Sequence, residues 1–328
     1  MVGRNHTRRA QNMIQNELIT AAAKGEISAA PHPYSAPEIA DEPRQFRFLV
    51  PWRILTFVLR ARWKRSVLFW FRFAAHPLLT ISWWRFLAGF AAARAFPAPH
   101  DALLQKPLSK FLVYGMRNSG RLARLVEHFL VAEKILARET MMRLWLGEKF
   151  DIGVVNGRNE TYTCRIALAD LCGGRHEGVF AIELVRTRDK ALLCTGRFTF
   201  LRQGSEGGYT FVIGSMQGPR NGKRLIVETT RDLLGVRPKE AILIVLQGLT
   251  VEGGMPYFLA VSRAKQPIQY RRRKRRSMML SAIDAFWAER SADPEDIYGF
   301  RVPKSATGGT DRRSRSKLRF HTIGELFH

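Results

Sequence analysis

Hydrophobic and polar residues alternate with a period of two through the middle of the chain. The alternation covers five stretches separated by short polar connections: residues 149–156, 161–169, 179–187, 192–202 and 209–218. This pattern is typical of strands with one buried face, and short connections rich in glycine and asparagine join neighbouring strands as hairpins. We therefore expect an antiparallel meander of five strands between about residues 149 and 218.

Apolar residues at helical spacing predict a helix before this meander. Leu122, Leu125, Phe129 and Leu136 recur along one face of the stretch 121–136. His128 lies near this stripe. A histidine in that position is more often a partly buried structural residue than a ligand.

Helices and a strand are also predicted after the meander. One helix covers residues 223–234, with Gly235 as its C-terminal stop, and Pro238 suits the first turn of the next. Residues 241–246 could equally form a buried strand, but the preceding Pro238 favours a helix. Residues 256–262 form a further predicted strand, and a basic run then leads into a late helix.

The two ends of the chain are polar, which suggests four regions. Residues 1–45 and 303–328 are expected to be mobile tails, the second of them basic. Residues 46–145 form a helical, basic and aromatic-rich region, and residues 146–302 form an α+β core. The expected fold class is α+β, with an N-terminal helical region followed by a mostly antiparallel sheet that has helices packed on it.

The most apolar region, residues 67–96, contains several tryptophans and arginines. Arg72, Arg85 and Arg94 interrupt it, so no uncharged run reaches the roughly 20 residues that a spanning helix needs, and we expect no transmembrane helix. Two interpretations stay open for the longer cationic and aromatic-rich segment from Trp52 to about Phe96. The segment lies on a membrane surface with its aromatic residues at the interface, or it packs as a helical layer on the rest of the protein.

The net positive charge of the chain favours anionic partners. The 328 residues include 53 Lys and Arg against 28 Asp and Glu, a formal net charge of +25. Such a field attracts anionic membranes, nucleic acid and phosphorylated or CoA-like ligands. The run "RRRKRR" at 271–276 indicates non-specific binding of polyanions, because no helix-turn-helix, RNA-recognition or zinc-finger pattern accompanies it.

Cysteine usage indicates a reducing compartment. Only Cys164, Cys172 and Cys194 occur, without C-x-x-C or zinc-like spacing, so we expect neither disulfides nor a metal site. A protein that is cytoplasmic, either free or peripheral to the inner membrane, fits this composition. No catalytic motif is recognisable, so the sequence assigns no catalytic residue.

The predicted fifth strand ends in a turn that is the best candidate for an anion site. The candidate residues there are Gly214, Gln217, Gly218, Arg220, Gly222 and Lys223. A helix N-terminus offers unpaired N–H groups, and glycines let the backbone approach a ligand closely. The spacing matches no known nucleotide-binding loop, and Pro219 lacks an N–H. An ordinary strand-to-helix connection therefore stays open as the alternative.

A second candidate site is the corner "GVRPK". Arg237 and Lys239 could face an anion there, or they could be solvated charges on a turn between two helices.

Four segments taken in order resemble the VirK/YbjX family of bacterial proteins. They read "IGSMQGPRNG", "ETTRDLLGVRPK", "FLAVS" and "IDAFWAE", and the similarity covers about residues 100–300. The resemblance marks His128, Gly214, Gln217, Gly218, Pro219, Thr230, Arg231, Gly235, Arg237, Pro238, Lys239, Asp284 and Trp287. It implies a role in virulence, envelope stress or tolerance of antimicrobial peptides, and it implies no particular reaction.

The predicted order of elements also resembles the acyl-CoA N-acyltransferase fold. In that fold the strand-to-helix turn holds the CoA pyrophosphate through backbone N–H groups, and "MQGPRNGK" occupies the corresponding place. Three functions follow as hypotheses. They are an envelope protein acting at the cytoplasmic membrane surface, an acyltransferase with acyl-CoA or an acyl carrier as its co-substrate, and a non-specific nucleic-acid-binding regulator.

Overall fold

The computed structural model describes residue 70 and residues 73–106, 110–203, 208–250, 254–270, 283–304 and 311–326. The expected N-terminal tail, the tryptophans and arginines before residue 70, and the basic run at 271–276 lie outside the described residues.

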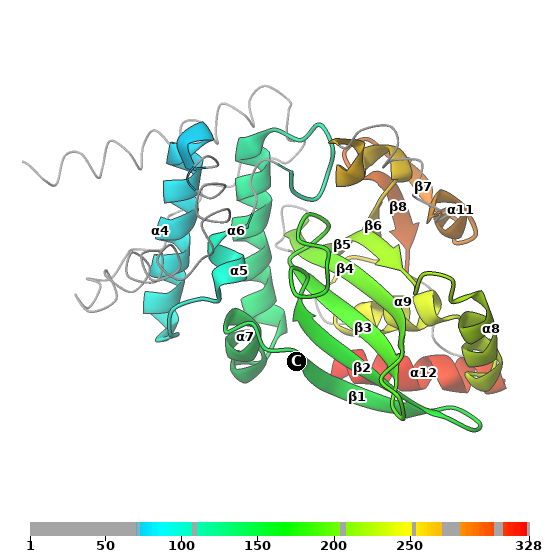
Figure 1. The fold of residues 1–328 in the computed structure, drawn as a ribbon. Coiled ribbons are helices and arrows are strands. Elements are labelled where there is room, and N and C mark those ends of the chain that lie inside the picture. Colours follow the sequence, from blue (N-terminus) through cyan, green and yellow to red (C-terminus); the bar gives the residue numbers. More distant parts are fainter. Residues whose placement is uncertain are drawn as a thin grey trace, which may run out of the picture.

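Eight strands form one sheet (Figure 1). They are β1 (Phe150–Asn156), β2 (Thr161–Leu168), β3 (Phe180–Arg186), β4 (Leu192–Arg202), β5 (Tyr209–Gln217), β6 (Tyr257–Val261), β7 (Asp293–Glu295) and β8 (Gly299–Pro303). Their order across the sheet is β1-β2-β3-β4-β5-β6-β8-β7. The first five strands are antiparallel neighbours, which confirms the predicted meander. The strands β7 and β8 were not predicted from the sequence.

The pair formed by β5 and β6 is the single parallel pair among the strands described. Two helices connect these strands, α8 (Lys223–Asp232) and α9 (Pro238–Gly248). The helical interpretation of residues 241–246 is therefore confirmed. Pro238 occupies the first turn of α9, where its missing N–H removes no hydrogen bond.

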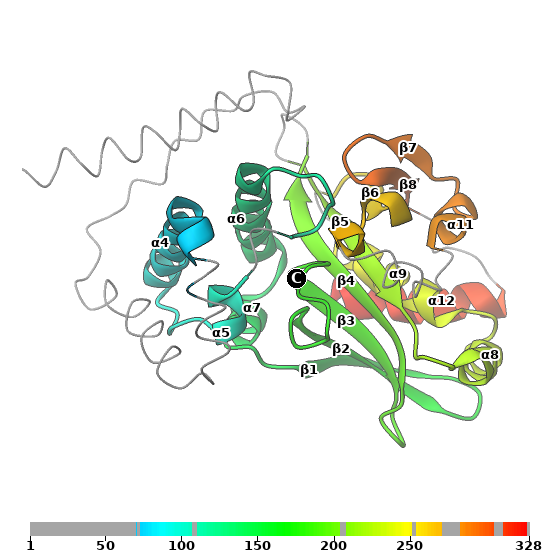
Figure 2. The ribbon, with the colours of Figure 1, turned by 45° about the horizontal axis from the view of Figure 1, so that its top comes forward.

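Helices cover both faces of the sheet (Figure 2). On one side lie α4 (Pro77–Arg94), α5 (Asp101–Leu104), α6 (Asn118–Ile135) and α7 (Arg138–Trp145), with α6 packed on β4. On the other side α9 packs on β3 and β4, and α12 (Arg312–Glu325) runs beside α9. The 3-10 turns Arg263–Lys265 and Pro267–Tyr270 and the short helix α11 (Ile283–Ala288) follow β6 in the chain, and Trp287 of α11 packs on Phe258 of β6. This arrangement confirms the α+β class.

The aromatic residues of α4 pack inside the protein. Trp83 is 1% exposed and donates its indole N–H to the Leu103 carbonyl at 2.8 Å. Its ring packs on Phe129 of α6, with the centroids 5.9 Å apart. The structure therefore favours a packed helical layer for this part of the segment. No helix in the described ranges is long and apolar enough to cross a membrane.

The expectation of a mobile C-terminal tail is wrong for residues 312–325. These residues form α12, in which Phe320 and Ile323 are buried. Asp311 caps the helix by accepting a hydrogen bond from the Ser314 N–H at 3.0 Å. The sequence of α12 looks polar because only a narrow stripe of the helix is apolar. This stripe packs against α9, where Gly324 allows the two helices to approach closely.

Candidate functional site

The strands β5 and β6 separate halfway along β5. They pair only at Val212 with Leu259 and at Ile213 with Ala260, besides an isolated bridge from Tyr209 to Gly254. On its other side, β5 stays paired with β4 up to Gln217. Residues 214–217 therefore have a strand partner on one side only; Gly214, Ser215 and Met216 are buried, and Gln217 is exposed.

The separation begins at a β-bulge. Ser215 pairs with Arg197, whereas Ile213 pairs with the next residue of β4, Phe198, so Gly214 is the extra residue. A Cβ on Gly214 would lie 1.7 Å from the carbonyl oxygen of Glu177. Gly214 is therefore required because the chain between β2 and β3 packs directly onto it.

Two buried polar side chains, Arg197 and Ser215, and the partly exposed Glu177 support this part of β5. The Arg197 guanidinium donates to Glu177 and to the Ser215 hydroxyl at 3.0 Å each, and to the Cys172 carbonyl at 2.6 Å. Ser215 in turn donates to Glu177 at 2.6 Å. The sequence analysis missed this cluster, although an arginine and a serine inside otherwise apolar strands were a usable signal.

The turn from β5 into α8 is exposed. Gln217, Gly218, Arg220 and Lys223 all reach solvent, and no side chain caps the first N–H groups of α8. These N–H groups and the two cations therefore form a surface to which an anion can bind. The structure thus brings the candidate residues of the turn together.

Two residues give the turn its shape. A Cβ on Gly222 would lie 2.3 Å from the Pro219 ring, so this position requires glycine. Asn221 adopts the left-handed conformation, with a φ of 59°, which asparagine tolerates better than most residues.

Thr230 and Arg231 lie at the other end of α8. A helix of ten residues is about 15 Å long, so they do not join the turn. The Thr230 hydroxyl donates to the Ile226 carbonyl at 2.7 Å within the helix. Gly235, with a φ of 92°, ends the helix as predicted.

Asp232 fixes the end of α8 to the hairpin between β1 and β2. It accepts hydrogen bonds from the Tyr162 hydroxyl at 2.9 Å and from the Asn159 N–H at 2.8 Å. No sequence pattern marks this residue.

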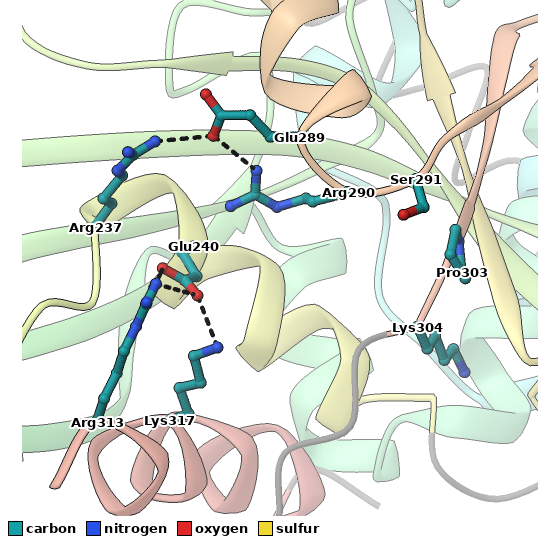
Figure 3. A pocket seen from close by; sticks show the side chains of 9 residues that line it. All are labelled: Arg237, Glu240, Glu289, Arg290, Ser291, Pro303, Lys304, Arg313 and Lys317. Carbon is teal, nitrogen blue, oxygen red and sulfur yellow. Dashed lines mark hydrogen bonds and ion pairs between the residues drawn. The ribbon is translucent and has the colours of Figure 1, made fainter. Parts of the chain in front are cut away.

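The second candidate corner lies against α11. Arg237 pairs with Glu289 at 3.0 Å (Figure 3). The Lys239 ammonium lies 5.6 Å from the centre of the Phe286 ring, and burial lowers its pKa. These two basic residues therefore face α11, although Arg237 remains more than half exposed.

Asp284 and Trp287 hold α11 on the sheet. The Asp284 carboxylate accepts the Arg263 N–H at 2.8 Å. Trp287 is fully buried, with its ring centre 5.9 Å from that of Phe258 in β6. Both residues are structural rather than part of a binding surface.

His128 is also structural. Its Nδ1 accepts the Phe200 N–H at 2.9 Å, and its ring stacks on that of Phe200. Complete burial, helped by Lys106, holds its pKa well below the usual value, so the imidazole is neutral. This bond ties α6 to β4, and the residue is more deeply buried than the sequence suggested.

The cysteines lack the properties of nucleophiles. Burial raises the pKa of Cys164, Cys172 and Cys194 to about 12, so all three stay protonated at neutral pH. The described residues contain no cluster of His, Cys, Asp and Glu with the geometry of a metal site.

The fold is α+β, and the exposed turn where β5 leads into α8 combines N–H groups that no side chain caps with two basic side chains. Residues 59–311 match the model of DUF535, a family described as proteins of unknown function. This match spans well over half of the chain, so the chain belongs to DUF535, the family to which VirK/YbjX proteins correspond. No curated protein and no solved structure matches the chain.

Proposed function

We propose that this protein is an acyltransferase that uses an acyl-CoA or an acyl carrier thioester. One observation carries the proposal: β5 keeps its pairing with β4 up to Gln217 but leaves β6 after Ile213, just before the turn into α8. The resemblance to the acyl-CoA N-acyltransferase fold, expected from the sequence, supports the proposal, because a strand-to-helix turn holds the CoA pyrophosphate in that fold.

The open edge suits the pantetheine arm of CoA. Its two amide groups would hydrogen-bond to the edge of β5 beyond Ile213, as an added strand does, entering from the exposed Gln217 because Gly214, Ser215 and Met216 are buried. The CoA pyrophosphate would then meet the uncapped N–H groups of α8 together with Arg220 and Lys223. Pro219 contributes no N–H, so the neighbouring residues of the turn supply the donors.

The reaction is a simple acyl transfer. A hydroxyl or amine of the acceptor attacks the thioester carbonyl, the carbon–sulfur bond breaks, and the thiol leaves with the proton of the acceptor. The hydrogen-bonded cluster of Arg197, Glu177 and Ser215 holds β5 in place while the ligand binds.

Calorimetry with CoA, acetyl-CoA and palmitoyl-CoA tests the binding step. The double variant Arg220→Ala/Lys223→Ala should weaken binding at least tenfold. The matched control Lys134→Ala removes an exposed cation from α6 and should bind normally. If none of the three ligands binds the wild-type protein, the proposal fails.

The biological setting we propose is the envelope, with the acyl acceptor at an anionic membrane surface. The net charge of +25 and the exposure of Trp70 (50%) and Leu78 (70%) near the start of α4 support this. Sedimentation with phosphatidylglycerol vesicles at physiological salt tests it, with phosphatidylcholine vesicles as the control. A protein that leaves both kinds of vesicle unbound would refute the membrane role and leave acyl-CoA binding untouched.

A further inference from the structure

A cavity of about 440 Å³ lies where α9, α11, α12 and the end of β8 meet (Figure 3). Its cationic side chains are Arg237, Arg290, Lys304, Arg313 and Lys317. None of the residues of the turn into α8 lines it, so it is separate from the proposed CoA surface.

The cavity carries an excess of positive charge. Five cations share two carboxylates, so three positive charges are left over (5 − 2). Glu289 pairs with Arg237 at 3.0 Å and lies 3.8 Å from Arg290. Glu240 pairs with both Arg313 and Lys317 at 3.0 Å.

Lys304 has no carboxylate partner among the residues that the structure describes. Its ammonium donates to the Thr250 carbonyl at 2.8 Å. Burial lowers the pKa of Lys304 to about 8 and also lowers that of Arg290. Desolvation is the cause in both cases, and for Arg290 it is partly offset by Glu240 and Glu289.

The lining indicates the chemistry of the ligand. Arginine guanidinium groups, with their paired N–H donors, and lysine ammonium groups together suit the oxygens of a phosphate group. A single carboxylate would neutralise only one of the three excess charges. Among the described residues that line the cavity there is no aromatic ring on which a base could stack, so the charged side chains are the groups available for recognition.

We infer that this cavity binds a phosphate group bearing at least two negative charges, as in a phosphomonoester. The volume exceeds that of the phosphate alone and leaves room for a small organic part. Such a group occurs both in free metabolites and in lipid headgroups. In either case the proposal is independent of acyl-CoA binding.

Titration calorimetry with orthophosphate and glycerol phosphate, at constant ionic strength with chloride, tests the inference. Lys304→Gln should weaken binding at least tenfold, because glutamine can still donate to Thr250 but carries no charge. Lys134→Gln, which changes the charge equally on α6, should leave the affinity unchanged. Equal affinity in wild type and Lys304→Gln, or no binding of either probe, would overturn the inference.

Additional experiments distinguish a free phosphate metabolite from a lipid headgroup, and the cavity from the proposed CoA surface. Binding of phosphatidate vesicles in place of glycerol phosphate, with the same loss in Lys304→Gln, would assign the site to a lipid headgroup. Lys317→Gln provides a second test if Lys304→Gln fails to fold. Arg220→Ala/Lys223→Ala should leave orthophosphate binding intact, so a failure of the acyl-CoA proposal would be seen separately.

Discussion

Arg197 of β4 and Ser215 of β5 lie opposite each other in the sheet and bind the same carboxylate, that of Glu177. This contact lies next to the bulge at which β5 begins to leave β6. The polar cluster therefore stabilises the half of β5 that lacks a second strand partner.

Loss of the arginine should be strongly destabilising. Arg197→Met leaves Glu177, Ser215 and the Cys172 carbonyl without their shared donor. We expect the free energy of unfolding in urea to fall by about 3 kcal/mol. Ser215→Ala removes a smaller part of the cluster and should cost only about 1 kcal/mol. Equal effects of the two variants would contradict the central role of Arg197.

The packing of α12 on α9 predicts intolerance of side chains at their contact. A Cβ on Gly324 would lie 2.2 Å from the Val245 carbonyl oxygen, and one on Gly248 would lie 2.2 Å from that of His321. Gly324→Ala should therefore destabilise the protein by about 2–3 kcal/mol in urea unfolding, because backbone has to move.

Gly120→Ala in α6 is the matched control. There a Cβ would meet only the flexible Met116 side chain at 3.4 Å. This variant should be neutral or stabilise the protein by up to about 1 kcal/mol. A neutral Gly324→Ala would show that α12 is not held against α9.

His128 should make stability depend on pH. Its pKa in the folded protein is well below the usual value, so the unfolded chain takes up the proton first as the pH falls. Its contribution is thus present at neutral pH and is lost below about pH 6.5, by up to about 1.4 kcal/mol per pH unit. Urea unfolding between pH 7 and 5 measures this slope. His128→Asn, which can accept the Phe200 N–H but does not titrate there, should show a shallower slope.

The turn and the strand edge should contribute separately to CoA binding. Arg220→Ala/Lys223→Ala removes charges that face the pyrophosphate, so CoA affinity should fall at least tenfold. Acetyl-pantetheine has no pyrophosphate, so its weaker binding should not change. An equal loss for both ligands in calorimetry would show that the turn does not bind the pyrophosphate.

Phosphate binding in the cavity should weaken at alkaline pH. Lys304 has a pKa of about 8, so it is charged below that pH and loses its charge above it. The groups around it in the cavity include four further cations and the carboxylates Glu240 and Glu289. Above pH 7.5 a phosphomonoester remains doubly charged, because its second pKa is about 6. Affinity should therefore fall from pH 7.5 to 9.5, whereas Lys304→Arg should flatten this dependence.

Local patterns were sufficient to predict much of the fold. Alternating residues showed the five strands of the meander, and Pro238 favoured the helix α9 over a strand. The parallel register of β6 and its early separation from β5 depend on long-range packing, which no local pattern encodes. The helix α12 was missed because its buried stripe is narrow and depends on two glycines in contact.

The candidate sites also differ in whether local sequence or long-range packing defines them. The turn residues adjoin one another in the chain, so their sequence revealed them. The cationic cavity draws on α9, α11, β8 and α12, and its residues Lys304, Arg313 and Lys317 fell in a segment expected to be a mobile tail. Only the folded chain brings them next to Arg237.

Amide hydrogen exchange with and without acetyl-CoA tests the central claim most directly. If pantetheine pairs with the open edge of β5, amides within residues 214–217 and the first turn of α8 should exchange more slowly in the complex. The amides of the β1–β2 hairpin should be unaffected. Acetyl-CoA that binds without protecting residues 214–217, or does not bind at all, would contradict the assignment of this edge as the acyl-thioester site.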